Sequence, residues 1–313
     1  MTQFAMLFPG QGSQSVGMLA DLAAAFPVVA ETFAEASDAL SIDLWSIAQQ
    51  GPAESLNQTT VTQPVMLAAD VAVWRVWSAL GGPTPSCLAG HSLGEYAALV
   101  AAEALSFADA MQLVARRAQL MQDAVPNGQG AMAAILGLDD EIVEAICREV
   151  EQGQVVAPAN YNSPGQLVIA GEADAVERAM LRCKDAGAKR AVILPVSVPS
   201  HCALMKSIAE TFDAALDQAS WQTPRIPVIH NVDLSSHDQA PAIRQALAAQ
   251  LFSPVRWTGT IQAMAERGIT RFAECGPGKV LTALGRRIVR EAEHRALETP
   301  DLIEACKAEW LEN

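Results

Sequence analysis

The sequence lacks several features that would assign a protein to a class at once. Lys and Arg total 21 against 35 Asp and Glu, a net charge of −14, and this shortage of basic residues argues against general nucleic-acid binding. No apolar run approaches the roughly 18 residues of a membrane span. The N-terminal apolar run has no positive charge before it, unlike a signal peptide. We therefore expect a cytoplasmic protein with no nucleic-acid or membrane partner.

Paired cysteines and metal-ligand spacings are also missing. The six cysteines are scattered without a C-x-x-C pair, which excludes a disulfide framework and a structural zinc site. We expect free, buried thiols, no metal and no cofactor. What the chain does have is 313 residues, half of them hydrophobic and 18% charged, enough for one large domain, or one large and one small domain.

Apolar runs that end in glycine-rich turns alternate with helical patterns, which favours an α/β fold. We expect strands at 4–8, 86–89, 226–230 and 271–275, and helices at 17–26, 27–40, 64–80, 95–102 and 106–124. The tail beyond Glu291 is expected to be an acidic helix on the surface.

Residues 128–196 have a different rhythm. The expected elements are strand 131–136, helix 139–151, strand 154–160, strand 166–170, helix 173–186 and strand 191–196. The order β-α-β-β-α-β is that of the ferredoxin-like split unit. We therefore expect a small ferredoxin-like domain, 128–196, inserted into a large domain formed by 1–127 and 197–313.

The segment Gly90–Gly94, Gly-His-Ser-Leu-Gly, matches the G-x-S-x-G nucleophile elbow. A serine on a sharp turn between a strand and a helix presents its hydroxyl outward, and glycines two residues away on each side avoid clashes. The following helix N-terminus offers N–H groups to a developing oxyanion. Ser92 is therefore a candidate nucleophile.

A serine hydroxyl needs a base, and the chain has five histidines. His91 adjoins Ser92, but neighbours on an elbow point apart. His237 and His294 are expected at the surface, and His230 is a candidate core histidine at a strand end. His201 follows Pro195 and Pro199, which would hold its backbone rigid, and is the strongest candidate.

Two further segments bear on the site. The loop Pro9–Gly12 follows the first strand and lacks the third glycine of a dinucleotide fingerprint, so we expect it to bring a backbone N–H, such as that of Gln11, near the reacting centre. Arg116 and Arg117 lie mid-helix, about 100° apart, so one of the two can face inward. A buried arginine requires an anionic partner.

Together these segments resemble the bacterial malonyl-CoA:acyl-carrier-protein transacylases. The matching motifs are Phe8–Gln14, Gly90–Glu95, Asn160–Gln166, Val198–Cys202, Pro254–Trp257 and Glu274–Gly278, in family order. Ala118 stands where the family usually has glycine. The resemblance implies an α/β-hydrolase-like core with a parallel sheet, the ferredoxin-like insert, and an active site between the two.

The resemblance also implies roles for individual residues. Ser92 is the nucleophile and His201 its base. The backbone carbonyl of Gln250 orients His201, in place of the acid of the hydrolases. The implied ligands of the acyl group are the oxyanion-hole N–H groups of Gln11 and Leu93, the Arg117 guanidinium for the malonate carboxylate, and Asn160 and Asn162 at the cleft rim.

The function that follows is ping-pong transfer of a malonyl group from malonyl-CoA to the pantetheine thiol of acyl carrier protein, by a monomer, for fatty acid synthesis. A serine thioesterase or esterase and a non-catalytic carrier-binding protein are the alternatives. An esterase predicts an essential Asp or Glu and no buried arginine. Because carriers are acidic, docking needs a local basic patch; the candidates are Lys189–Arg190 and Arg286–Arg287 with Arg290.

Overall fold

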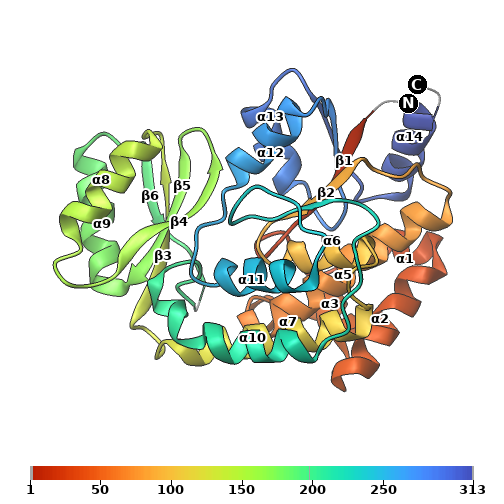
Figure 1. The fold of residues 1–313 in the computed structure, drawn as a ribbon, viewed down its shortest axis with the longest axis horizontal. Helices are drawn as coiled ribbons and strands as arrows, with labels where there is room; N and C mark the ends of the chain where they lie inside the picture. Colours follow the sequence, from red (N-terminus) through yellow and green to blue (C-terminus); the bar gives the residue numbers. More distant parts are fainter. Residues whose placement is uncertain (1–2, 197, 312–313) are drawn as a thin grey trace.

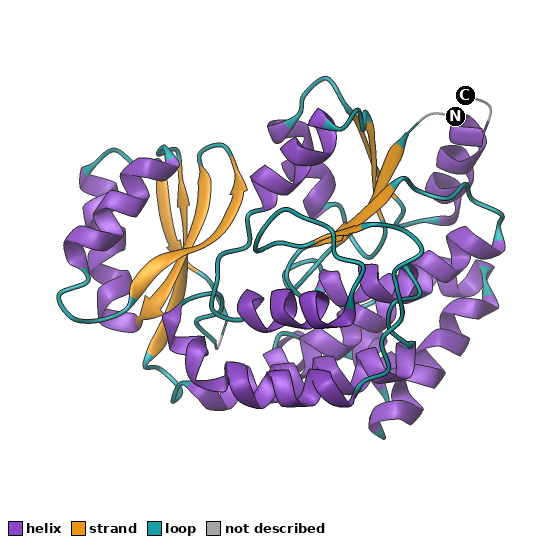
Figure 2. Cartoon of the chain, in the orientation of Figure 1, coloured by secondary structure: helices purple, strands orange, loops and turns teal. Residues whose placement is uncertain are grey.

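The computed structural model describes residues 3–196 and 198–311. Residue 197, where the large domain was expected to resume, lies outside the described residues. The chain is an α/β protein with one parallel sheet and one separate antiparallel sheet (Figure 2). Figure 1 shows the antiparallel sheet at one end of the molecule and the parallel sheet, among most of the helices, at the other.

The parallel sheet has the strand order β7-β2-β1-β8-β9. Its strands are β1 Phe4–Phe8, β2 Cys87–Gly90, β7 Val228–Ile229, β8 Arg271–Glu274 and β9 Glu293–Ala296. The central strand β1 is fully apolar because both faces of the sheet are covered. Alternate side chains enter different cores: Phe4, Met6 and Phe8 one core, Ala5 and Leu7 the other.

Helices pack around this sheet (Figure 1). They are α1 Ala20–Ala25, α2 Pro27–Leu40, α3 Leu44–Gln50, α4 Ala53–Leu56, α5 Thr59–Ala79, α6 Gly94–Ala101, α7 Phe107–Ala124, α10 Ala209–Gln218, α11 Ala240–Gln250, α12 Trp257–Glu266, α13 Val280–Ile288 and α14 Pro300–Leu311, with a 3-10 turn at Ala203–Ile208. No helix in the described part of the chain is long and apolar enough to cross a membrane. All six cysteines are described, buried and free.

The antiparallel sheet has the order β4-β5-β3-β6. The elements are β3 Gly130–Leu136, α8 Asp140–Val150, β4 Val156–Ser163, β5 Gln166–Glu172, α9 Ala173–Asp185 and β6 Arg190–Ile193, in the predicted sequence of strand and helix. Both helices lie on the outer side of the sheet, away from the parallel sheet (Figure 1). They enclose a separate apolar core whose members all fall between 131 and 191.

Backbone hydrogen bonds tie β4 to the segment before α12. Tyr161 N donates to Val255 O at 2.9 Å, and Val255 N donates to Ala159 O at 2.8 Å, which forms a parallel bridge between Asn160 and Val255. The antiparallel sheet is therefore fastened to the rest of the chain along one of its edge strands.

Helix α5 begins five residues before its predicted start. The predicted helix, 64–80, started at Pro64. Pro64 lies instead inside α5, and the turn before it is stabilised by burial of Thr59, Thr62 and Gln63. The packing of these buried side chains stabilises the helix by more than is lost with the backbone hydrogen bond that Pro64 cannot donate. The short helices α3 and α4 were not predicted.

The prediction of an acidic surface helix beyond Glu291 was wrong for its first part. Residues Glu293–Ala296 form β9, the edge strand of the parallel sheet, and α14 starts at Pro300. His294, expected at the surface, is 5% exposed and stacks on Phe272 at 5.0 Å. The charged neighbours of His294 concealed a strand with one buried side chain. His237 is partly exposed and pairs with Asp233.

Candidate active site

Ser92 occupies the sharp turn between β2 and α6. Its φ of 52° lies in the left-handed region, which strains a residue with a side chain. A Cβ on Gly90 would lie 1.8 Å from the Gly94 carbonyl carbon, and one on Gly94 would lie 2.2 Å from Phe8 O. Glycine is therefore required at both positions, because the backbones of Gly90 and Gly94 lie against each other and Gly94 lies against the end of β1.

The Ser92 hydroxyl faces His201. The Ser92 Oγ to His201 Nε2 distance is 2.7 Å, and His201 Nδ1 lies 2.8 Å from the backbone oxygen of Gln250. His201 also has a positive φ, 62°, and its N–H donates to Leu251 O at 3.0 Å. The end of α11 thus holds both the ring and the backbone of this histidine, with Nδ1 as the protonated nitrogen and Nε2 free to accept from Ser92.

The imidazole of His201 is held in its neutral form. Burial, as the larger cause, and the nearby Arg117 charge together lower its pKa from the ordinary value of 6.5 to about 3. Burial also lowers the pKa of His91. A neutral His201 is the state that can accept the serine proton.

Arg117 is the inward-facing member of the arginine pair. It is 1% exposed, whereas Arg116 is exposed. Its Nη2 donates to Ser92 Oγ at 3.1 Å and to Gln250 Oε1 at 2.9 Å, and its Nη1 donates to Gln63 Oε1 at 2.7 Å. A guanidinium therefore touches the same oxygen as the candidate base.

A cavity of about 150 Å³ opens over Ser92. Gln11, Asn160 and Asn162 line it, and Asn162 Oδ1 lies 2.9 Å from His91 Nε2. Most of its remaining lining is apolar and comes from the antiparallel sheet and the chain after it: Met132, Val168, Leu194, Val196 and Val198. Neither the Gln11 nor the Leu93 N–H has an acceptor within 3–196 and 198–311, so both donors are free to serve an incoming oxyanion.

The structure therefore brings every predicted site residue into one region. Nucleophile, base, guanidinium and free N–H groups around an apolar cavity are the components of acyl transfer through serine.

Comparison with known proteins identifies the family. The model of the acyl transferase domain matches residues 5–304. The malonyl CoA-acyl carrier protein transacylase of Escherichia coli strain K12 is 56% identical over 306 residues, which cover 98% of this chain and 99% of that protein. This chain belongs to the acyl transferase family.

Solved structures of acyl transferases agree. The malonyl CoA-acyl carrier protein transacylase of Coxiella burnetii superposes with a TM-score of 0.97 at 52% identity, covering 98% of this chain and 97% of that one. A malonyl-transacylase in complex with a type II PKS acyl-carrier protein gives a TM-score of 0.97 at 55% identity and covers 98% of this chain and all of its own.

Three polar residues beneath the acyl transferase site were not singled out from the sequence. Asn231 Oδ1 accepts from Ser92 N at 2.9 Å and its Nδ2 donates to Gly90 O at 2.8 Å, so it holds the elbow from below. Gln63 holds Arg117, and Glu95 is fully buried in α6. A glutamate inside an alanine-rich helix was the available signal, because glutamate is rarely buried without partners.

The lowered pKa of His201 gives a pH prediction. Because His201 stays neutral as the pH falls, we expect the rate at which an uncharged fluorophosphonate labels Ser92 to change less than about twofold from about pH 8 to about pH 5. A base with an ordinary pKa near 6.5 would lose about 30-fold over that interval. The rate is measured by mass spectrometry, with Ser92→Ala as the unlabelled control, and a decline centred near pH 6.5 would contradict the prediction.

Proposed function

We propose that this protein transfers the malonyl group of malonyl-CoA to the pantetheine thiol of acyl carrier protein through a malonyl-serine intermediate on Ser92. The observation that carries the proposal is the shared contact at Ser92 Oγ, which lies 2.7 Å from His201 Nε2 and 3.1 Å from Arg117 Nη2. The relatives named malonyl CoA-acyl carrier protein transacylase match this chain over nearly their whole length.

The first half-reaction uses the groups around Ser92. Its oxygen attacks the thioester carbonyl while His201 Nε2 takes the hydroxyl proton, and Gln250 O stabilises the imidazolium through Nδ1–H. The N–H groups of Gln11 and Leu93 donate to the tetrahedral oxyanion. The C–S bond then breaks, His201 returns the proton to the leaving thiolate, and CoA departs.

The second half-reaction runs the same steps in reverse with another thiol. His201 takes the proton of the pantetheine thiol, and the sulfur attacks the ester carbonyl. The bond between that carbon and Ser92 Oγ then breaks, the proton returns to Ser92 Oγ, and the malonyl thioester departs. No group is consumed, so ping-pong turnover requires no metal or redox cofactor. We also propose, from the sequence, that the enzyme is monomeric and cytoplasmic.

The Arg117 guanidinium favours a malonyl group over an acetyl group. Malonyl and acetyl thioesters differ by one carboxylate, and burying that charge unpaired is costly. Arg117 is already in contact with Ser92 Oγ, so a carboxylate two carbons from the ester oxygen lies within its reach. The serine esterase alternative is disfavoured, because a backbone carbonyl takes the place of its acid and a buried cation contacts the nucleophile oxygen.

We also propose the finer description of the fold. The antiparallel strand order, with local strands 2-3-1-4, supports a ferredoxin-like unit at 128–196. The serine elbow after a parallel strand supports a hydrolase-like core for 1–127 and 197–313. The self-contained core between 131 and 191 supports this division.

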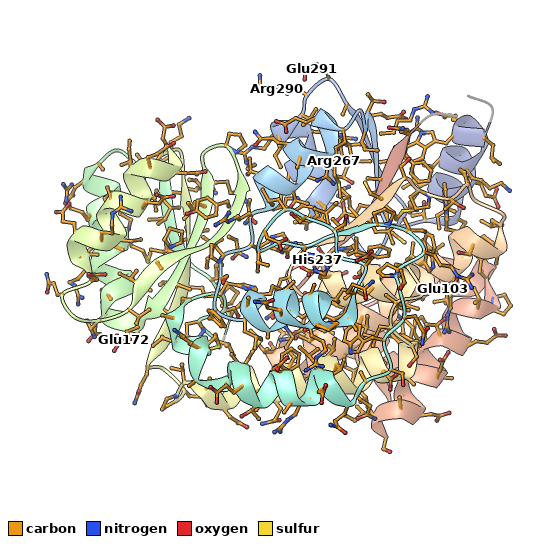
Figure 3. The ribbon with its side chains drawn as sticks, viewed as in Figure 1. Glu103, Glu172, His237, Arg267, Arg290 and Glu291 are labelled. Carbon is orange, nitrogen blue, oxygen red and sulfur yellow. The ribbon has the colours of Figure 1, made fainter. Side chains whose placement is uncertain are left out.

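We propose that the carrier protein docks on a basic groove formed by both domains. Lys189 and Arg287, from the two predicted clusters, line the same groove of about 480 Å³. Arg287 donates to Gln166 Oε1 at 2.6 Å and to Pro164 O, which anchors it beside the β4–β5 turn. Arg190 is exposed nearby on β6, whereas Arg290 projects into solvent beside Glu291 (Figure 3).

The first test asks whether Ser92 carries the malonyl group. Incubation with radiolabelled malonyl-CoA alone, followed by acid precipitation, is expected to leave about one label per folded chain. Ser92→Ala is expected to carry none, because within residues 3–196 and 198–311 Ser92 supplies the only hydroxyl hydrogen-bonded to the His201 ring. Release of free malonate at a comparable rate would indicate an esterase, and a folded Ser92→Ala variant with near-normal transfer would end the proposal.

The second test concerns Arg117. Arg117→Ala is expected to lower malonyl transfer by at least about 10–100-fold, the value of a lost charge-assisted pair of roughly 1.5–3 kcal/mol, and to leave acetyl transfer equal or improved. Lys is expected to rescue only in part, because a point charge cannot reproduce the fork. The exposed Arg116→Ala is the matched control. An equal loss with both acyl groups would make the role of Arg117 structural.

The third test concerns docking. Lys189→Glu with Arg287→Glu is expected to raise the KM for carrier protein several-fold at low salt and to leave the KM for malonyl-CoA unchanged, since local charge steers an acidic partner. The control is Arg225→Glu with Arg267→Glu, an equal change of charge outside the groove. Equal carrier kinetics in the two double variants would exclude this groove.

A further inference from the structure

Glu95 lies directly beneath the site and is 0% exposed. Its Oε2 accepts from Gln250 Nε2 at 2.7 Å and from Asn231 N at 3.2 Å, and its Oε1 lies 2.5 Å from His230 Nδ1. Nothing in the reaction steps above uses this carboxylate. Burying a charged carboxylate costs free energy, and the three hydrogen-bond partners of Glu95 offset that cost.

Gln250 connects Glu95 to both halves of the site. Its backbone oxygen accepts from His201 Nδ1, its side-chain Oε1 accepts from Arg117 Nη2 at 2.9 Å, and its Nε2 donates to Glu95 and, at 3.0 Å, to Ser92 O. One residue thus touches the base, the cation and the elbow. Its position sets the geometry of all three.

The orientation of the Gln250 amide is decided by its two charged neighbours. A guanidinium can only donate, and an ionised carboxylate can only accept. With Arg117 on one side and Glu95 on the other, the amide has a single arrangement that satisfies both, with oxygen toward the arginine and nitrogen toward the glutamate. An amide at position 95 could donate or accept, so Arg117 alone would then select the orientation of the Gln250 amide.

Glu95 also supplies the negative charge nearest in this network to the buried guanidinium. Within the described residues, Arg117 forms no ion pair, and its acceptors are the neutral oxygens of Gln63, Ser92 and Gln250. The interposed amide keeps the carboxylate from binding Arg117 directly. The cation is therefore balanced but still open to an incoming malonate carboxylate.

We propose that Glu95 is a positioning residue for acyl transfer, which acts through the side chain of Gln250 to fix Arg117 for the malonate carboxylate and to hold His201 and the Ser92 elbow. This inference rests on the proposed function, because it assigns Glu95 to the same site. Glu95 itself touches no reacting atom.

The variant that tests it is Glu95→Gln, which keeps the shape and removes the charge. We expect the kcat for malonyl transfer to fall by about 10-fold or more, since small displacements of reacting groups are costly in rate. Acetyl transfer is expected to fall less, because it does not use Arg117. A merely structural role would lower transfer of both acyl groups equally, in proportion to the folded fraction measured by circular dichroism.

A double-mutant cycle with Gln250→Met separates action through the amide from any other route. Methionine removes the amide but keeps the backbone oxygen for His201. If Glu95 acts through Gln250, adding Glu95→Gln to Gln250→Met is expected to change malonyl transfer by less than about twofold. Full additivity of the two losses, or unchanged malonyl transfer in Glu95→Gln, would overturn the inference.

Two further measurements guard against misfolding and against failure of the function itself. Gln250→Met alone is expected to lower malonyl transfer more than acetyl transfer, and a wild-type ratio would overturn the inference even if Glu95→Gln does not fold. Glu274→Gln is the buried control: Glu274 accepts from Leu281 N and Thr282 N, and its loss should change stability but not the acyl ratio. A wild-type chain that forms no malonyl-serine would contradict the proposed function instead, before any variant is compared.

Discussion

Removing a guanidinium from water is costly unless its donors find acceptors, and Arg117, on helix α7, is 1% exposed. Burial lowers its pKa, yet the group stays charged because an arginine pKa starts so high. Gln63, Ser92 and Gln250 supply acceptor oxygens for its Nη1 and Nη2, which offset much of the cost of burial, whereas its Nε has no hydrogen-bond partner among the described residues. Burial and the same cation together lower the pKa of His201, so the buried charge and the base strength are linked in one site.

The parallel sheet explains why these groups meet. In such sheets sites form beyond the carboxyl ends of the strands. The loop after β1 carries Gln11, and the neighbouring β2 ends two residues before Ser92. The elbow fits only because glycines at 90 and 94 let α6 start against the end of β1. The strained backbone of Ser92, with φ of 52°, is stabilised by the hydrogen bond that its N–H donates to Asn231 Oδ1.

Sequence reasoning recovered the parts whose signal is local. Short apolar runs bounded by glycine predicted β1, β2 and β8, and the 128–196 rhythm predicted all six elements there. It failed where tertiary packing overrode the local pattern: Pro64 inside α5, and β9, whose charged residues concealed the buried His294. In the site, the G-x-S-x-G motif predicted Ser92. His201 was favoured as the base because it follows Ser92 in the chain and comes after two prolines. Glu95 and Asn231 escaped because their importance lies in contacts across 135 to 155 residues of chain.

The antiparallel sheet lines one side of the site and is joined to the rest of the chain by hydrogen bonds. Hydrogen bonds join β4 to Val255 on both sides of Asn160, and Asn162 reaches His91 beside the nucleophile. These contacts place the apolar side chains Met132 and Val168 of the same sheet over the cavity at Ser92. Because the cavity is only about 150 Å³, an acyl group bound to Ser92 fills much of the space that water would need. We propose that this limited space beside Ser92, more than the strength of the base, favours transfer to a thiol on a long, flexible arm over hydrolysis.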